Sequence, residues 1–563
     1  MMPISVIFMA YISKNVIDAL VSSGSGDIIR GELLLLLILL FLIAISRHIM
    51  QRLMDYCQSM HDEILSGSLS TNIMEHMLSA DLEYFDNPTY HDKLVAADSD
   101  SHAISYITWN VLSGAGAILS FFSVFVVLAQ ARLVFGFIVL AASLPASIIS
   151  AKYTKLLYAL SLEQVNGLRQ MGYHRGVATS RTHAQEMRLY NAGGKLIERY
   201  RSIWYSLFIK RRNVTFKRTF VTTLLGCLPE VAVLIIGIDI SFGVLAGRAT
   251  VGDYSLYISL AAQLLTAITV LSSSIINIYD NQMKIENFKG IKKFVCHVTD
   301  SGIEKLSCVE TITFEDVCFS YPSALNRAIN NVSFHIGRGE KVAFVGLNGS
   351  GKTTLIKLLL RMYDPDSGTI YINGTDIKEY KLTSLRSNFS VYFQDVQNYC
   401  FTLRENLTIA DDTHPEHEKA VNDALSAADC SDLLDWSCNG LDVNISRLFS
   451  DDGIELSGGQ HQKLALARTL YRRHTALVLD EPSSSLDPKS EYKVFESLKH
   501  FTEGRTTLFT SHRLSNVFLA DRIIVMERGS VIEDGSQEEL LRSKHRFAEL
   551  FGYQQRKYQT SDS

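Results

Sequence analysis

Long stretches without a charged residue crowd into the first half of the chain. Residues 103–131, 133–151 and 254–279 contain no Asp, Glu, Lys or Arg. A helix that crosses a lipid bilayer needs about 20 predominantly apolar residues. Each of these three stretches is therefore predicted to span a membrane.

Two further stretches are predicted to be spans because they lie beside the first three. The leucine-rich run Leu33–Ser46 is shorter and, taken alone, also fits a buried helix of a soluble protein. Residues 219–244 are long enough to cross, although Pro229, Glu230 and Asp239 interrupt them. Together with the first three, these stretches make five predicted spans.

The opening segment is a weaker candidate. It has about a dozen apolar positions before Lys14, fewer than the ~17 of a full span. It also lacks the basic segment and small-residue cleavage site of a signal peptide, so we expect it to be retained. We interpret it as the outer part of a first span, with a truncated start as the alternative.

Basic residues predict the orientation of the spans. The connections near residues 21–32, at Arg132 and over 246–253 carry three Arg between them, whereas residues 153–218 carry thirteen Lys and Arg. Cytosolic connections are enriched in Lys and Arg, so the basic segment is predicted to be cytosolic. It and the other long connection, about residues 48–102, show helical patterning. The spanning helices are therefore expected to continue far into the cytosol.

The second half of the chain has a different texture. Residues Thr311–Phe319 and Lys341–Gly346 are predicted strands in an alternation of strands and helices, which is typical of an α/β fold. The predicted domains are an all-α six-helix transmembrane domain over 1–280, a charged linker over 281–311, an α/β domain over 312–551 and a polar tail over 552–563.

A glycine-rich loop follows the second predicted strand. The residues GLNGSGKTT match GxxxxGK[ST] from Gly346 to Thr353. In such loops backbone N–H groups wrap phosphates, the lysine supplies charge to the β and γ phosphates of ATP, and the hydroxyl ligates Mg²⁺. A plain glycine turn is the alternative, but the flanking strand and helix favour the phosphate site. The candidate ATP-binding residues here are Gly346, Asn348, Gly349, Ser350, Gly351, Lys352, Thr353 and Thr354.

Two carboxylates follow a very apolar run. Residues Ala476–Leu479 are predicted to form a buried strand that ends in Asp480 and Glu481. We expect Asp480 to hold Mg²⁺ and Glu481 to orient and deprotonate the attacking water. A pair of capping acids is the alternative, and it does not account for the strand before it.

These motifs are accompanied by the segment LSGGQ, Leu456–Gln460, which resembles the signature of ATP-binding cassette (ABC) proteins. The resemblance extends over nearly the whole chain and implies an ABC ATPase domain. It implies that Tyr321 stacks on adenine, that Gln394 senses Mg²⁺ and the membrane domain, and that His512 contacts the γ phosphate. Taken singly, the three residues also fit a core tyrosine, a surface glutamine and a loop histidine. The further ATP-binding positions that it implies are Ser457, Gly458, Gly459, Gln460 and, in the loop Ser485–Leu486–Asp487, Asp487.

The chain departs from the family pattern at two places. Ser450–Gly453 stands where related exporters often carry a Gly-Glu-Arg-Gly-like stretch, which puts the detail of coupling in doubt. Lys463 stands where arginine is commoner, and we expect little effect.

Six spans before one cassette resemble an exporter-type half-transporter, in which two chains sandwich ATP. Because Glu481 and the signature are both intact, we expect a homodimer, with a heterodimer as the alternative. Phe85–Leu94 and Ala184–Tyr200 resemble coupling segments, with Tyr90 and Leu189 as candidates to contact a cassette. For Leu189, packing within its own domain is the alternative.

The expected activity is ATP-driven export of a peptide, drug-like amphiphile or lipid, in a bacterial plasma membrane. An ATP-gated regulator or channel shares every one of these features, whereas a soluble cassette ATPase has no use for the spans. The chain as given begins without a peptidase domain, so a processing exporter is not expected. Glu230 is predicted near mid-depth of its span, where an ionisable group marks a functional site or a paired structural carboxylate. Asn110, Gln263 and Ser272–Ser274 are further candidates for a substrate cavity.

Charge and cysteine content exclude other classes. The net charge of -5 argues against nucleic acid as a partner. The eight cysteines show no CxxC pair and no metal-ligand spacing, so buried free thiols are expected.

Overall fold

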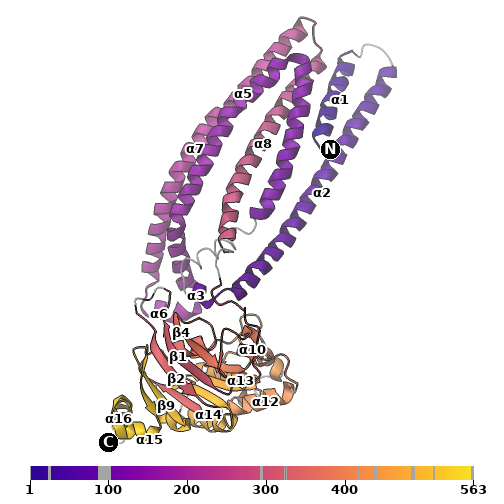
Figure 1. Cartoon of the computed structure of the whole chain (residues 1–563). Coiled ribbons are helices and arrows are strands. Elements are labelled where there is room, and N and C mark those ends of the chain that lie inside the picture. Colours follow the sequence, from indigo (N-terminus) through magenta and orange to yellow (C-terminus); the bar gives the residue numbers. More distant parts are fainter. Residues whose placement is uncertain are drawn as a thin grey trace. The chain divides into compact units, whose positions relative to one another are not determined.

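The computed structural model describes residues 2–22, 27–85, 103–291, 296–322, 324, 326–415, 417–434, 440–482, 488–511 and 514–559. The chain forms two compact units, shown in Figure 1. The first consists of Met1–Leu78 and Thr89–Phe294, and the second of Ser79–Pro88 and Val295–Ser563.

Among the described residues of the first unit, the regular elements are all helices. Its helices are α1 (Met2–Ser22), α2 (Asp27–Ser79), α5 (Ala103–Thr179), α6 (Arg181–Leu189), α7 (Gly193–Leu245) and α8 (Val251–Ile291). Five helical segments are long and apolar enough to cross a membrane: Gly31–Ser79, Ala103–Gln130, Arg132–Thr179, Gly193–Leu245 and Val251–Gln282. The five predicted spans are confirmed by length and composition. A crossing by α1 stays a prediction.

The second and third of these segments are the two parts of the kinked helix α5. Arg132 has extended backbone angles, φ -153° and ψ 120°, between two helical stretches of α5. Its guanidinium donates to both carboxylate oxygens of Asp239 on α7, at 2.9 and 2.7 Å. Asp239, one of the two acids that interrupt the predicted span 219–244, is therefore paired. Pro229 does not end α7 either, because the helix continues to Leu245.

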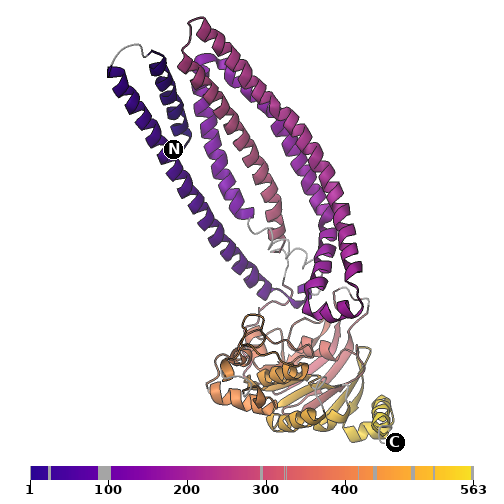
Figure 2. The same ribbon diagram turned by 180° about the vertical axis from the view of Figure 1, so that it is seen from behind.

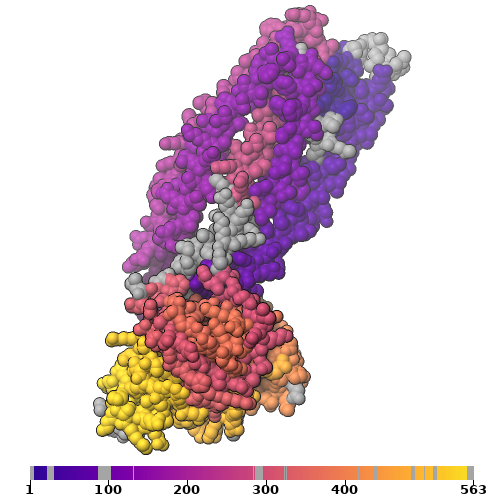
Figure 3. Space-filling model, in the orientation of Figure 1, coloured from indigo at the N-terminus to yellow at the C-terminus, as the bar shows by residue number. Residues whose placement is uncertain are grey.

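The helices α5, α7 and α8 pack along one another, as Figures 1 and 2 show from opposite sides. Leu128, Ile236, Leu260 and Leu264 are fully buried where these helices meet. In contrast, α2, drawn in indigo in Figure 3, exposes apolar side chains throughout its membrane-spanning part. Such a surface suits lipid or another protein chain.

Two sheets form the second unit. Their orders are β2-β1-β4-β5 and β10-β9-β3-β8-β7-β6. The strands are β1 (Ile312–Phe319), β2 (Ile329–Ile336), β3 (Lys341–Val345), β4 (Ser367–Ile372), β5 (Thr375–Asp376), β6 (Phe389–Tyr392), β7 (Ala476–Asp480), β8 (Thr506–Ser511), β9 (Arg522–Glu527) and β10 (Ser530–Gly535). Strands β6, β7, β8, β3 and β9 are mutually parallel, so their carboxyl ends meet at one edge.

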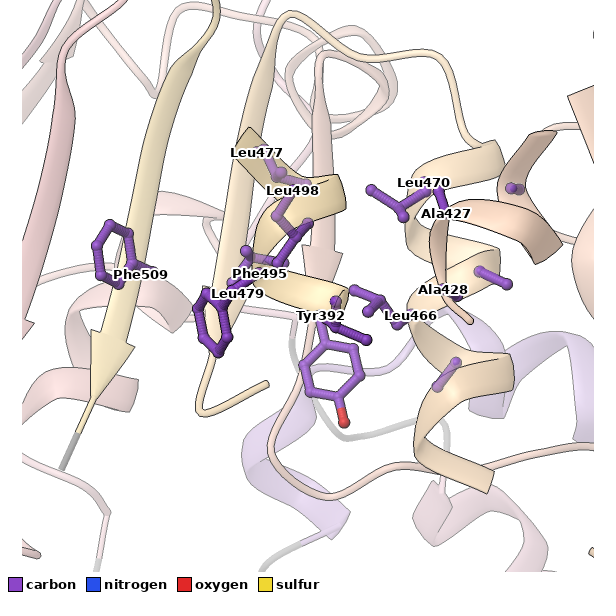
Figure 4. Packing of buried hydrophobic residues seen from close by; sticks show 14 of the residues in the cluster. Tyr392, Ala427, Ala428, Leu466, Leu470, Leu477, Leu479, Phe495, Leu498 and Phe509 are labelled. Atoms are coloured by element: carbon purple, nitrogen blue, oxygen red, sulfur yellow. The ribbon is translucent and has the colours of Figure 1, made fainter. Parts of the chain in front are cut away.

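Helices complete the second unit. They are α3 (Leu82–Phe85), α9 (Lys352–Leu359), α10 (Leu382–Ser387), α11 (Leu403–Thr408), α12 (His417–Ala427), α13 (Gly458–Tyr471), α14 (Pro488–Phe501), α15 (Gln537–Ser543) and α16 (Arg546–Gln559). Figure 4 shows how Leu466 and Leu470 of α13 pack near Tyr392 and the strand residues Leu477 and Leu479. This apolar cluster fixes α13 against the parallel sheet.

The domain boundaries stay a prediction, although α8 continues through Ile291 into the expected linker. The prediction of buried thiols is wrong for most cysteines, because spacing does not show which face of an element a residue takes. Among the described residues, Cys318 and Cys430 are buried, Cys296 and Cys308 are partly exposed, and Cys57, Cys227 and Cys400 are exposed; all seven are free.

Candidate nucleotide-binding and catalytic site

The loop between β3 and α9 requires glycine at specific positions. Gly349 and Gly351 have φ of +78° and +106°, in the region that side chains other than glycine rarely adopt. A Cβ atom on Gly346 would lie 2.4 Å from the carbonyl oxygen of Met526. A Cβ atom on Gly351 would lie 2.8 Å from that of Ala328. Glycine is thus required at these two positions because the loop packs closely against the protein's own backbone.

The donors of this loop have few partners within the protein. Gly351 caps α9 without any side-chain hydrogen bond, so the first N–H groups of the helix keep their capacity for an anion. The Ser350 hydroxyl is buried, and it has no hydrogen-bond partner among the described residues. A buried hydroxyl without a partner is costly. A phosphate oxygen in the loop would satisfy it, so the residues fit the phosphates of ATP.

Lys352 is buried at the start of α9. Its ammonium donates to the carbonyl oxygens of Gly346 at 2.9 Å and Leu347 at 3.2 Å. Burial lowers its pKa, and the nearby charges of Glu481 and Asp480 act in the opposite direction. The ammonium thus lies within the loop that would hold the phosphates.

Asp480 lies at the end of β7 and is almost fully buried. Its carboxylate accepts from the hydroxyls of Thr353 at 2.9 Å and Thr510 at 2.5 Å. Burial raises its pKa, and these two hydrogen bonds oppose the rise. A hydroxyl beside a carboxylate is an oxygen ligand set that suits Mg²⁺, so Thr353 and Asp480 fit a magnesium ion.

Glu481 follows directly and has an unusual backbone. Its φ is +54°, uncommon for a residue with a side chain, and its N–H donates to the Thr510 hydroxyl at 3.1 Å. Its side chain accepts from the amide nitrogen of Gln394 at 2.9 Å. Two segments far apart in sequence thus converge on one carboxylate. A strained backbone held by its surroundings is frequent at active sites.

The sequence motifs did not point to Thr510. Its hydroxyl contacts both acidic residues because it lies on β8, in register with Asp480 on β7. Only the pairing of the strands could have revealed it.

Tyr321 borders the site from the first sheet. Its hydroxyl lies 3.2 Å from that of Thr354 on α9, and its ring meets those of Phe319 and Tyr363 edge-on. Lys357 lies 5.5 Å from its ring centre. The ring is partly exposed and is held next to the phosphate loop.

The signature residues form the start of α13. The Ser457 hydroxyl accepts from the Gln460 N–H, and the Gln460 side chain accepts from the Ser457 N–H, which makes a capping box. Ser457 and Gly458 are exposed, and their described hydrogen bonds do not reach the Lys352 site. Asn348 is exposed in the phosphate loop.

Some predicted residues cannot be placed. Asp487, the rest of its loop, His512 and Tyr90 lie outside the described residues. Lys463, one of the two departures, donates to the backbone oxygen of Asp429 at 2.9 Å and to its carboxylate at 2.8 Å.

The candidate cavity residues lie in the helical unit. Asn110 on α5 accepts from Asn277 on α8 at 3.2 Å, a partner that the sequence did not single out. Gln263 donates to Ser259 at 3.2 Å, and its amide oxygen is buried with no partner among the described residues. Glu230 is exposed on α7. The structure does not bring these three residues together by any described contact.

Comparison with protein families covers both halves of the chain. The family described as "ABC transporter transmembrane region" matches residues 4–268, and the family described as "ABC transporter" matches residues 329–484. The two matches follow one another in a single chain.

Three relatives illustrate the similarity. The subtilin transport ATP-binding protein SpaT of Bacillus subtilis is 28% identical over 95% of this chain and 86% of its own length. The ATP-dependent lipid A-core flippase of Haemophilus ducreyi is 29% identical over 97% and 92%. The beta-(1→2)glucan export ATP-binding/permease protein NdvA of Agrobacterium fabrum is 35% identical over 54% and 51%.

The fold has a solved counterpart. A bacterial Atm1-family ABC exporter with ATP bound superposes with a TM-score of 0.82 at 23% identity, covering 98% of this chain and 97% of that one. The helical unit, the phosphate loop with its paired acids and both family matches therefore place this chain in the ATP-binding cassette transporters, as an exporter-type half-transporter with an ATPase domain.

Proposed function

We propose that this half-transporter works as a homodimer that exports an amphipathic or lipid-like substrate by closing two cassettes around ATP. The observation that carries the proposal is that the phosphate loop and the two acids lie together in one chain, whereas the described hydrogen bonds of Ser457 and Gly458 do not reach them. In this chain the site brings together Lys352, Thr353, Asp480 and Glu481. In contrast, the signature serine Ser457 is exposed and its described hydrogen bonds stay within the start of α13, so in the proposal it covers ATP on another chain.

In this proposal each residue of the site has a defined task. Lys352 offsets the charge of the β and γ phosphates, and Ser350 donates to a phosphate oxygen. Glu481, held by Gln394, orients the attacking water and takes its proton. Thr353 and Asp480 hold Mg²⁺, which neutralises charge on the phosphates when bound. Tyr321 supports the adenine ring, and closure of the cassettes excludes water.

Lys352→Ala tests the phosphate site. We expect weaker ATP binding, because the buried ammonium no longer offsets phosphate charge. Undiminished ATP affinity in this variant would contradict the assignment.

A homodimer requires that one kind of chain suffices. Purified protein from a host without related transporters should hydrolyse Mg-ATP and yield a dimer on chemical crosslinking. ATPase activity that depends on co-expression of a second, different half-transporter would show a heterodimer instead.

The relatives' names include a lipid A-core flippase, a glucan exporter and a subtilin transporter, so they agree on export and differ in cargo. Within the helical unit, two polar groups lie among apolar helices: the Gln263 amide oxygen, which has no partner among the residues that the structure describes, and the Asn110–Asn277 pair. Polar groups among apolar helices suit a substrate with polar and apolar parts.

Glu230→Gln tests the cavity assignment. We expect altered stimulation of ATPase by substrate with a near-unchanged basal rate, because Glu230 lies in a membrane-spanning segment. A variant that fails to fold, or one that matches the wild type in both rates, would favour a structural role. Lipid and peptide uptake into inverted vesicles separates an exporter from an ATP-gated channel, since only a pump concentrates its substrate.

A further inference from the structure

A half-buried guanidinium lies on the helix that begins with the signature. Arg468, on α13, donates from Nε to the backbone oxygen of Asn406 at 2.7 Å and from Nη1 to that of Gln397 at 2.9 Å. Its Nη2 donates to the side-chain oxygens of Asn398 at 2.8 Å and Asn406 at 3.0 Å. The ring of Tyr399 lies 5.1 Å from the guanidinium carbon.

Every acceptor in this set is a neutral oxygen. Charge-assisted hydrogen bonds are stronger than neutral ones, and the planar fork of arginine fixes their directions. Asn406 has no exposed surface, and its amide also donates to the backbone oxygens of Tyr399 and Thr402. Arg468 and Asn406 together hold the segment Gln397–Tyr399 in one conformation.

The same segment has a second attachment close to the signature. The Asn398 amide donates to the backbone oxygen of His461 at 2.9 Å and lies 2.9 Å from its Nδ1. His461 directly follows Gln460, which closes the capping box with Ser457. Residues 397–399 are therefore fastened to α13 at its beginning and further along the helix.

The other end of this connection is the catalytic site. Gln394, whose amide holds Glu481, lies three residues before Gln397 in the sequence. The Val396 N–H donates to the Gln394 backbone oxygen at 3.1 Å, which makes the intervening turn compact. A short, hydrogen-bonded path thus joins Glu481 to the helix that presents Ser457.

We propose that Arg468 is a positioning residue that couples the two ATP sites of the dimer, by transmitting movement of Gln394 to the signature of the same chain. The proposal rests on the ATP sandwich proposed above, in which Gln394 contacts one site and Ser457 covers the other. ATP at the first site then changes how the second is covered, which is positive cooperativity.

Arg468→Lys tests the coupling. Lysine keeps the charge but cannot form the fork, so the bonds to Gln397 and Asn398 are lost. We expect the Hill coefficient of ATPase to fall to about 1 and kcat to fall about tenfold, the equivalent of one charge-assisted hydrogen bond. Affinity for ADP, which reports the phosphate loop without closure, should stay within about twofold of the wild type.

A second variant and a control separate coupling from stability. Asn398→Ala should reproduce the loss of cooperativity, and combining it with Arg468→Lys should add little, because residues of one network are non-additive. Arg472→Lys is the matched control, since Arg472 directly follows α13 and, among the described residues, donates from its side chain to the backbone oxygen of Arg386. It should keep wild-type cooperativity.

The outcomes are distinct. Cooperative ATPase in Arg468→Lys equal to the wild type overturns the inference, as does a fall in ADP affinity that matches the fall in kcat. Additive losses in the double variant overturn it as well. A wild-type enzyme that is itself non-cooperative and does not crosslink as a dimer overturns the proposed sandwich, and the inference with it.

Discussion

Replacing Glu481 by glutamine should stop turnover while leaving ATP bound. The amide has nearly the size of the carboxylate. Its oxygen can still accept from the Gln394 amide, which lies 2.9 Å from the carboxylate of Glu481 in the wild type. The backbone, at φ +54°, is no more strained for glutamine than for glutamate, and its N–H still donates to the Thr510 hydroxyl. Lys352 and Asp480 are untouched, so the protein should fold and bind ATP.

What the variant loses is the ability to take a proton from water. Loss of a general base lowers the rate by about 10²- to 10⁴-fold. This corresponds to about 3 to 5 kcal/mol of activation free energy. In the proposed sandwich Ser457 still covers the γ phosphate, so the variant should accumulate with its cassettes closed.

Two measurements on the same sample check both parts. ATPase rate reports the loss of the base, and the distance between spin labels on the two cassettes reports closure. Glu340→Gln is the matched control, because Glu340 binds the Gly337 N–H and Arg522 rather than the site. If Glu481→Gln keeps more than about a tenth of the wild-type rate, the loss is smaller than that expected for a general base, and the assignment is refuted.

Three further predictions follow from burial in the cassette. Ser350→Ala should weaken ATP binding about two- to tenfold, the value of one hydrogen bond, without lowering the thermal midpoint, because the hydroxyl has no partner among the described residues. Unchanged affinity in a binding titration would contradict this. Maleimide should label the exposed Cys400 in folded protein but Cys430 only after unfolding, since burial raises the pKa of the Cys430 thiol to about 12; mass spectrometry of native samples labelled at Cys430 would refute it. Burial lowers the pKa of His474 to about 4, so the unfolded state binds its proton more readily and stability falls as pH drops from about 6.5 towards 4. Between pH 7 and pH 5, His474→Gln should remove about 2 kcal/mol of the change in unfolding free energy. Thermal midpoints that fall equally with pH in both proteins would argue against this prediction.

The sequence alone predicted much of the architecture, because each predicted feature is a local pattern. A charge-free run of the length of a bilayer predicts a spanning helix wherever it occurs, and five were confirmed. Arg132 marked the break in α5, because a charge between two apolar runs is most stable at the membrane surface. The phosphate loop was predictable for the same reason: its glycines, lysine and hydroxyl are consecutive, so spacing along the chain already implies the geometry.

Tertiary structure decided the contacts between residues that are far apart in sequence. The pairing of Arg132 with Asp239 showed that an acid expected to disrupt a span is neutralised from another helix. The parallel register of β7 and β8 brought Thr510 to Asp480, which no motif indicated.

The same limit applies to burial and to the cluster around Arg468. Most cysteines turned out partly or fully exposed, because residue type does not fix which face of an element points outward. Arg468 looked in the sequence like one more basic residue after the signature. Its role depends on acceptors about 60 to 70 residues away in the chain, which only the packing of α11 and α13 brings within hydrogen-bonding distance. Local sequence determines which elements form and what chemistry they carry, whereas long-range packing determines which groups meet, because hydrogen bonds act over about 3 Å.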